Sequence, residues 1–189
     1  MSSMERQANN SLQNSVIINK VESGLPRWLI EVGFVLMVVQ AVCNEQHLCD
    51  WIEGNGYEIP RTLLFLVGDV ILYYAMLRGM KTLRYPFTWM WWTLIVVDVA
   101  GCITYVAPES PVNLALAIAL PLVYLPLGLG ITYFYRGRLQ WVGVFLIADM
   151  VVFMIFPIVL FPFELYLLVD VCCILTVTAL AWTMRRVLV

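Results

Sequence analysis

The chain has 189 residues, of which 62% are hydrophobic and 13% are charged, and its formal net charge is −2. Soluble domains are about half apolar and about one quarter charged, so a single soluble core cannot hide this much apolar surface. The mean hydropathy of +0.86 therefore indicates a membrane protein whose main partner is the lipid bilayer. The small net charge gives no reason to expect a nucleic-acid partner.

The first part of the chain, residues 1–26, is polar and rich in Ser and Asn. It lacks the apolar core of a cleaved signal peptide, so we expect it to be retained. It would form a cytoplasmic N-terminal segment, as a flexible tail or a short surface helix. A transmembrane domain would follow over residues 27–186.

Six segments are long and apolar enough to be membrane spans, since a helix needs about 20 residues to cross about 30 Å of hydrocarbon. They are approximately residues 27–46, 61–80, 86–106, 112–135, 139–160 and 164–184. The short break "FPF" makes the last two spans a tight antiparallel hairpin or a re-entrant pair. The predicted fold class is therefore all-α, a polytopic integral membrane helical bundle with six transmembrane helices.

The fourth span differs from the others in its helix-breaking residues. Its sequence "LALAIALPLVYLPLGLG" contains Pro121, Pro126, Gly128 and Gly130. Each proline removes a backbone donor and frees a carbonyl group, which predicts a kinked or broken helix. Broken helices at membrane depth are tolerated where the freed carbonyls face protein or water, and in transporters such carbonyls help to coordinate cations.

The basic residues fix the orientation of the bundle, because Lys and Arg accumulate on the cytoplasmic side. Arg61 falls on one side of the six-span arrangement. The other ten fall on the opposite side: Arg6, Lys20, Arg27, Arg78, Lys81, Arg84, Arg136, Arg138, Arg185 and Arg186. We therefore expect both termini to be cytoplasmic and the protein to reside in a plasma membrane or a bacterial inner membrane.

The loop after the first span contains the single histidine of the chain, His47, between Cys43 and Cys49. In an oxidising compartment these two thiols could form a disulfide bond that ties the end of the span to the loop. Metal binding by the three side chains is the alternative. Their spacing fits no standard zinc pattern, so no metal site is predicted.

Four aspartates interrupt the apolar spans: Asp69, Asp98, Asp149 and Asp170. From the helical rise they lie roughly 10–17 Å below the outer end of their spans, in one layer. No Lys or Arg lies in the interior of a span to pair with them, since Arg27, Arg61 and Arg78 stand at or near the ends of their spans. We predict that they face a common interior cavity and bind a cation or a small amine ligand.

Helical spacing places Tyr73 one turn after Asp69 and Tyr166 one turn before Asp170, on the same faces. Glu31 differs, because the first span runs outward and leaves it roughly 6 Å from the cytoplasmic face. We take Tyr73 as a further ligand-binding residue, and Glu31 and Tyr166 as secondary ones.

Two interpretations of the four aspartates differ in how the carboxyl groups are protonated and what they bind. Clustered like charges cannot all ionise in a low dielectric, so some carboxyls keep their protons near neutral pH. A cation entering the site would displace those protons, and its binding would weaken as the pH falls. Alternatively, each aspartate is neutral and simply hydrogen-bonds to a neighbouring helix.

Two aspartate-bearing segments, "LLFLVGDVILYY" and "VGVFLIADMVVF", resemble those of the transmembrane lysoplasmalogenase family. The resemblance implies an intramembrane hydrolase that acts on ether lysolipids, with Asp69 and Asp149 as active-site carboxylates. It is confined to these two segments. The sequence between them departs from the family pattern, and this chain has fewer spans.

Three classes of function remain open. The first is a small cation- or proton-linked transporter or channel, which the missing basic partners favour. The second is an intramembrane lipid hydrolase with paired aspartates as acid and base. The third is a non-catalytic membrane partner, such as an immunity or defence-effector protein, that works in a homo-oligomer or membrane complex. No cofactor is expected in any of them.

Overall fold

The computed structural model describes residues 16–43, 46–105, 111–160 and 165–189. The described chain is almost entirely helical, which confirms the all-α prediction. Its elements are β1 (Val16–Ile17), α2 (Arg27–Cys43), α3 (Gln46–Gly54), α4 (Glu58–Thr82), α5 (Trp89–Tyr105), α6 (Pro111–Phe134), β2 (Tyr135–Arg136), α7 (Arg138–Leu160) and α8 (Tyr166–Leu188).

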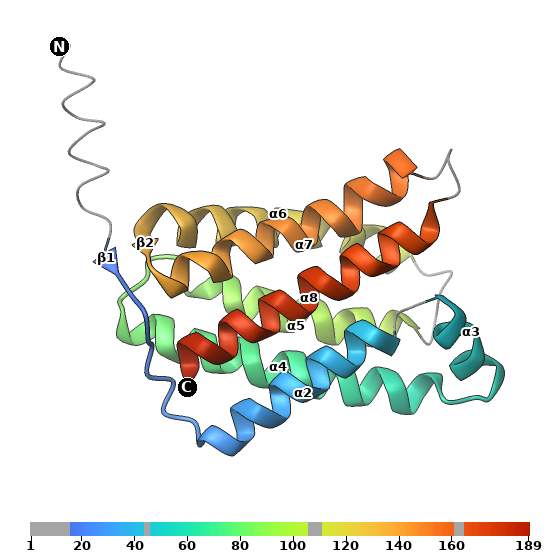
Figure 1. Ribbon diagram of the computed structural model, residues 1–189, viewed down its shortest axis with the longest axis horizontal. Coiled ribbons are helices and arrows are strands. Elements are labelled where there is room, and N and C mark those ends of the chain that lie inside the picture. The colour runs from blue at the N-terminus through green and yellow to red at the C-terminus, as the bar shows by residue number, and fades with distance from the viewer. Residues whose placement is uncertain (1–15, 44–45, 106–110, 161–164) are drawn as a thin grey trace, which may run out of the picture.

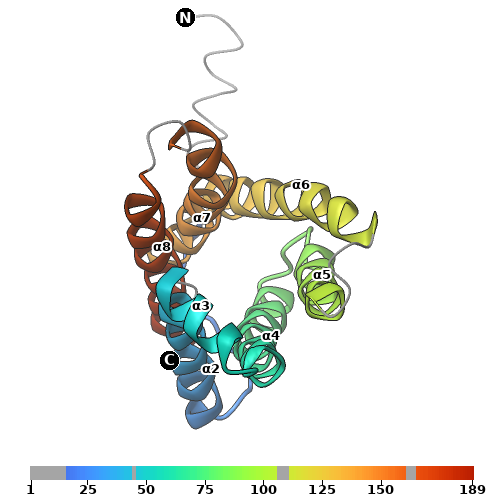
Figure 2. The same ribbon diagram turned by 90° about the vertical axis from the view of Figure 1, so that its right-hand side faces the viewer.

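The six long helices form a closed ring. Each packs against the next along the chain, from α4 through α5, α6 and α7 to α8, and α2 closes the ring by contacting both α4 and α8. Figure 2 shows this ring in a view along the bundle, and Figure 1 shows that successive long helices run in alternating directions. This antiparallel order is the one expected for helices joined by short connections.

The main difference between the observed helices and the predicted spans lies in the loop after the first span. Residues predicted as an outer loop form the short helix α3. Ile52 is buried one turn after Leu48, while Asp50 and Trp51 are exposed. The short helix α3 therefore has one buried and one exposed face, as an amphipathic helix does. A search for long apolar segments does not detect such a helix.

The fourth long helix, α6, is continuous through Pro121 and Pro126. The helix is therefore not broken, and the alternative, a kink, stays a prediction. The prolines still remove the donors for the carbonyls of Ala117 and Leu122, four residues earlier. Close packing against α7 supports the helix next to these gaps, because Gly128 lies directly against Gly143 of α7.

Two helical segments in the described part of the chain are long and apolar enough to cross a membrane, Thr62–Thr82 and Leu167–Leu188. Two shorter apolar segments are Trp89–Ala100 and Ala119–Phe134. Two such segments are weak evidence for a membrane protein, so the six-span bundle stays a prediction.

The N-terminal segment crosses one end of the bundle as an extended strap. β1 pairs in parallel with β2, with Val16 opposite Tyr135. Farther along, the amide of Val21 donates to the carbonyl of Val187 at 2.8 Å, and the amide of Leu139 donates to the carbonyl of Ile18 at 3.1 Å. The strap therefore ties together the ends of α6, α7 and α8, and Val21 also packs on Gly79 of α4. We call this the basic end of the bundle.

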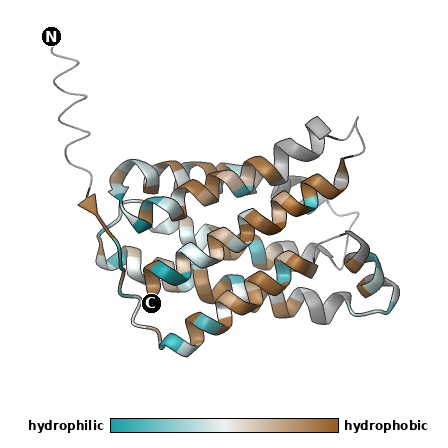
Figure 3. Ribbon diagram, viewed as in Figure 1, coloured by the Kyte–Doolittle hydropathy of each residue, from teal (hydrophilic) through white to brown (hydrophobic). Residues whose placement is uncertain are grey.

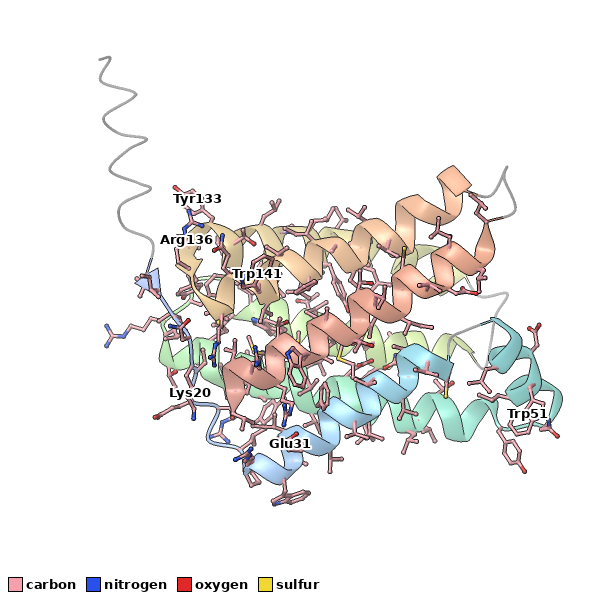
Figure 4. The ribbon with its side chains drawn as sticks, in the orientation of Figure 1. Lys20, Glu31, Trp51, Tyr133, Arg136 and Trp141 are labelled. Carbon is pink, nitrogen blue, oxygen red and sulfur yellow. The ribbon has the colours of Figure 1, made fainter. Side chains whose placement is uncertain are left out.

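Every Lys and Arg side chain that the structure describes belongs to the basic end. They are Lys20, Arg27, Arg78, Lys81, Arg84, Arg136, Arg138, Arg185 and Arg186. Figure 4 shows Lys20 and Arg136 at this end and Trp51 of α3 at the opposite end. The side chain of Arg61, near the start of α4, is outside the described ones.

Glycine contacts set how closely the helices approach one another. A Cβ atom on Gly143 would lie 2.5 Å from Thr132 Oγ1 and 2.6 Å from the Gly128 carbonyl oxygen, both on α6. A Cβ atom on Gly68 would lie 2.7 Å from Leu36 Cβ of α2. Small residues at helix contacts are the usual means of close packing in membrane bundles.

Replacement of Gly143 by Ala should destabilise the protein. Ala favours a helix over Gly by up to about 1 kcal/mol, but forcing a methyl group into a filled contact costs about 1–3 kcal/mol. Backbone atoms cannot easily yield here, so we expect the second effect to dominate. Melting in detergent, followed by the loss of the monodisperse peak, measures the change.

Gly54→Ala is the matched control, because no atom lies within 4 Å of its Cβ position. This variant should melt like the wild type or slightly above it. Equal melting of the Gly143 and Gly54 variants would contradict the close contact between α6 and α7.

Candidate functional site

Three aspartates from three helices lie within electrostatic reach of one another. Asp69 of α4, Asp98 of α5 and Asp149 of α7 lie near enough for their charges to interact, with Asp69 affected by Asp149 and Asp98 affected by both. Asp69 is buried, and Asp98 and Asp149 are partly buried. The helical ring thus brings together carboxyl groups that are far apart in the sequence.

Two tyrosines complete this group, which we call the carboxyl cluster. The hydroxyls of Tyr73 on α4 and Tyr124 on α6 share a buried hydrogen bond of 2.8 Å. Both phenols lie within electrostatic reach of Asp69 and Asp98. Because a phenol both donates and accepts, the pair can hydrogen-bond a carboxyl group or supply an oxygen ligand.

The remaining two helices contribute neutral polar side chains to the same region. Gln40 of α2 is a hydrogen-bonding neighbour of Asp69, and Thr176 of α8 is one of Asp149. The Thr176 hydroxyl also lies 2.9 Å from the carbonyl oxygen of Cys172. All six long helices therefore place a polar side chain in the cluster or beside it.

Several buried polar atoms of the cluster have no hydrogen-bond partner. Asp69 Oδ1 and Asp98 Oδ2 are two of them, and Trp91 Nε1, next to Tyr73, is a third. Buried polar atoms normally have partners, so each such atom needs an explanation. Carboxylate oxygens without donors, in a site that contains no Lys or Arg among the described side chains, suit a positively charged ligand.

The cluster occupies one layer across the bundle. Its members stand 9 to 13 residues from the helix terminus at the basic end; Asp98, for example, lies nine residues after Trp89. This corresponds to about 14–20 Å along the helix axis.

A close-packed apolar plug fills the space between this layer and the basic end. Its members are the largest fully buried side chains of the described chain: Ile30, Leu72, Met76, Leu77, Met80, Trp91, Leu94, Leu127, Ile131, Leu139, Leu146 and Leu180. Eleven of them lie on the basic-end side of every cluster residue in their own helix, and Leu72 lies between Asp69 and Tyr73 of α4. The plug therefore separates the cluster from the basic end.

Asp170 lies apart from the other three aspartates. It is on α8, partly buried, and its charge reaches Cys173, which Asp149 also affects. It is not among the charged groups that act on Asp69 or Asp98. Asp170 stands six residues before Thr176, or about 9 Å farther from the basic end.

Glu31, one of the two secondary residues, does not join the cluster. Glu31 accepts two hydrogen bonds from Arg185, from Nε at 2.5 Å and from Nη2 at 2.9 Å, and this ion pair fastens α2 to α8 at the basic end. The Arg185 guanidinium also lies over the rings of Phe34 and Trp182. The side chain of Tyr166 is outside the described ones.

Sequence reasoning missed Tyr124, Gln40 and Thr176. A signal for Tyr124 existed, because it is the one polar side chain between Pro121 and Pro126 in an otherwise apolar stretch. Gln40 and Thr176 carry no such signal. Their roles follow from the pairing of α2 with α4 and of α7 with α8.

The predicted disulfide bond between Cys43 and Cys49 stays a prediction, since the side chains of Cys49 and His47 are outside the described ones. Among the residues that the structure does describe, no group of three or more His, Cys, Asp or Glu side chains could hold a metal ion.

Comparison of the chain with protein-family models, with curated proteins and with solved structures gave no match.

Two carboxyl substitutions should shift stability in opposite directions. Asp98→Asn removes a buried charge that its neighbours repel, so this variant should melt at the wild-type temperature or above it. Glu31→Gln removes the carboxylate that pairs with Arg185, so it should melt at a lower temperature. Melting in detergent distinguishes them, and a strongly destabilised Asp98→Asn variant would show that the cluster carboxyl is a structural hydrogen-bonding group.

Proposed function

We propose that the chain is a multi-pass membrane protein whose carboxyl cluster binds a cation, and that it acts as a small cation- or proton-linked transporter or channel. The observation that carries this proposal is that Asp69, Asp98 and Asp149 lie within electrostatic reach of one another, with no basic side chain near them among those that the structure describes. Intramembrane carboxylates are costly and typically mark ion or proton pathways. The ligand itself supplies the missing positive charge.

The outer faces of the helices support a membrane location. Val32, Val35, Val39 and Val42 follow one another along α2 at helical spacing, and all four are exposed. On α8, Leu167 is 70% exposed and Leu175 is 62% exposed. Figure 3 shows apolar residues along much of these helices. Soluble monomers rarely expose apolar surfaces of this extent, whereas lipid would cover them.

The basic end is proposed to be cytoplasmic. The described basic side chains gather there, which is the distribution of the positive-inside rule. Six crossings by α2, α4, α5, α6, α7 and α8 place both termini on this side. The opposite end, with α3, would then face the outside.

Access to the cluster would be one-sided in this conformation. The apolar plug blocks the way to the basic end, so a cation would enter from the opposite end. Asp170 lies about one and a half turns nearer to that end and is suited to a first contact. Passage to the basic end requires the plug to open, which favours a transporter over a permanently open channel.

A small monovalent cation, a proton or an amine suits the cluster better than an anion. The carboxylate oxygens supply negative charge, and the Tyr73 and Tyr124 hydroxyls supply neutral oxygen atoms. Protons compete for the same carboxylates, which links cation binding to proton release.

A second candidate is a lipid hydrolase that uses Asp69 and Asp149. The electrostatic interaction between these two carboxyls favours it, because acid–base catalysis needs two carboxyls in different protonation states. It ranks second, since hydrolysis of a lipid with a phosphate-bearing headgroup usually employs a nearby Arg or Lys. The described part of the cluster holds neither.

Cation uptake into proteoliposomes tests the first function. The wild-type protein should take up a monovalent cation or an amine, and Asp69→Asn and Asp149→Asn should each reduce the initial rate by about tenfold or more. Uptake should slow as the external pH falls, because protons occupy the carboxylates that the cation needs. Asp50→Asn is the control, since it removes an exposed carboxylate of α3 that lies outside the cluster.

The same vesicles separate the candidate functions when they contain lysolipids. Release of the lipid headgroup, lost in both Asn variants, would replace the transport proposal by the hydrolase. Full uptake in the Asp69, Asp98 and Asp149 triple Asn variant would refute a role of the cluster in transport.

Reporter fusions test the six crossings. Reporters placed after residues 53 and 109 should be outside, and those after residues 82, 137 and 189 should be cytoplasmic. This alternation follows from the antiparallel order of the long helices. A cytoplasmic reporter at residue 53 would contradict the proposed topology.

A further inference from the structure

A second polar feature lies at the basic end, on the outside of the ring. It is a pocket with a volume of about 470 Å³ between the strap, the last turns of α4 and the first turn of α5. Its polar lining includes Ser23, Arg78, Lys81 and Glu22, and Tyr74 and Trp92 are its aromatic residues. The apolar plug separates it from the carboxyl cluster, so it is a different site.

The two cations of this pocket have no ion-pair partner among the described side chains. Arg78 and Lys81 lie three residues apart on α4, and therefore on neighbouring positions of one helix face. The guanidinium of Arg78 lies over Gly24 of the strap, where a Cβ atom would be 3.0 Å from Nη2. With Glu22, the lining carries two positive charges and one negative charge. The net positive charge suits a singly charged anion.

Ser23 supplies a buried hydroxyl to the same pocket. It is 5% exposed, and its Oγ accepts a hydrogen bond from the amide of Leu25 at 3.2 Å. Its own hydroxyl hydrogen therefore stays available for donation. Thr82 is different, because its hydroxyl already donates to the carbonyl oxygen of Gly79 at 2.6 Å. Arg78, Lys81 and Ser23 are thus three donors suited to phosphate oxygens.

Aromatic side chains place this pocket at the depth of lipid headgroups. Tyr74 and Trp92 are exposed and stack edge to face with their ring centroids 6.0 Å apart. Tyr and Trp are enriched at the boundary between hydrocarbon and headgroups. Tyr74 stands one turn of α4 before Arg78, on the hydrocarbon side of the cation. The pocket therefore has apolar contacts on one side and cationic contacts on the other.

We propose that this pocket binds the phosphate-bearing headgroup of an anionic membrane phospholipid. The proposal rests on the membrane location and the cytoplasmic basic end proposed above, but not on transport by the cluster. Arg78 and Lys81 bind the phosphate oxygens, Ser23 donates a further hydrogen bond, and Trp92 and Tyr74 contact the upper acyl chains. Basic pockets between helices on the cytoplasmic side recognise headgroups in this way.

Lipid-dependent melting tests the proposal with the full chain in neutral detergent. Short-chain phosphatidylglycerol should raise the melting temperature by about 3 °C or more, and phosphatidylcholine of the same chain length should not. The double variant Arg78→Gln, Lys81→Gln should lose this rise. If the double variant does not fold, the single variant Lys81→Gln replaces it. This variant keeps the contact of Arg78 with the strap and should lose part of the rise in melting temperature.

The matched control is the double variant Lys20→Gln, Arg138→Gln, which also removes two positive charges from the basic end. It should keep the rise with phosphatidylglycerol. Loss of the rise in this control, or an equal rise with phosphatidylcholine, would overturn the proposal. An equal rise with inorganic phosphate would show a site for a soluble anion and overturn the lipid source.

Asp69→Asn separates this proposal from the proposed transport. It should keep the phosphatidylglycerol effect even though it loses uptake. If the wild type shows the lipid effect without transport, the transport proposal fails while the lipid site stands. Monodisperse wild-type protein without detergent would instead refute the membrane location on which both depend.

Discussion

Asp69, Asp98 and Asp149 would repel one another if all three were ionised, and no described basic side chain is among the groups that act on Asp69 or Asp98. Ionised groups in a low dielectric are stable only with partners, water, protons or a bound cation. Tyr73, Tyr124, Gln40 and Thr176 provide neutral hydrogen-bonding neighbours that lower this cost but do not cancel the charge. In the proposed function, a proton or the bound cation would supply the positive charge that offsets these carboxylates.

Close helix packing is what keeps these groups in one layer. Gly68 lets α2 approach α4 directly beside Asp69. Gly143, six residues before Asp149, lets α6 approach α7. Larger residues at these positions would push the helices apart and widen the cluster. Gly68 and Gly143 therefore serve the geometry of the site as well as the stability of the bundle.

The sequence was sufficient to predict the long helices, because each is an apolar segment bounded by charge, Pro or Gly. It also predicted inward faces for all four aspartates, since a carboxyl group has few other places in such a helix; Asp69 is buried, and Asp98 and Asp149 are partly buried. It could not place Asp170, because the rotation of α8 about its axis depends on packing against α2 and α7. Nor could it show that α6 continues through Pro121 and Pro126. The close contact between Gly128 of α6 and Gly143 of α7 is a tertiary feature that the sequence does not specify.

The two ends of the bundle are unequal in a way that bears on the proposed transport. Three contacts hold the helices together at the basic end. They are the Glu31–Arg185 ion pair, the backbone hydrogen bond from Val21 to Val187 and the pairing of β1 with β2. The apolar plug lies directly behind these fastenings. A cation that leaves the cluster toward the basic end needs the plug to separate, and α8 cannot move away from α2 while Glu31 holds Arg185. The strap and the ion pair thus oppose opening on this side, and any cycle of alternating access would have to break or carry them along.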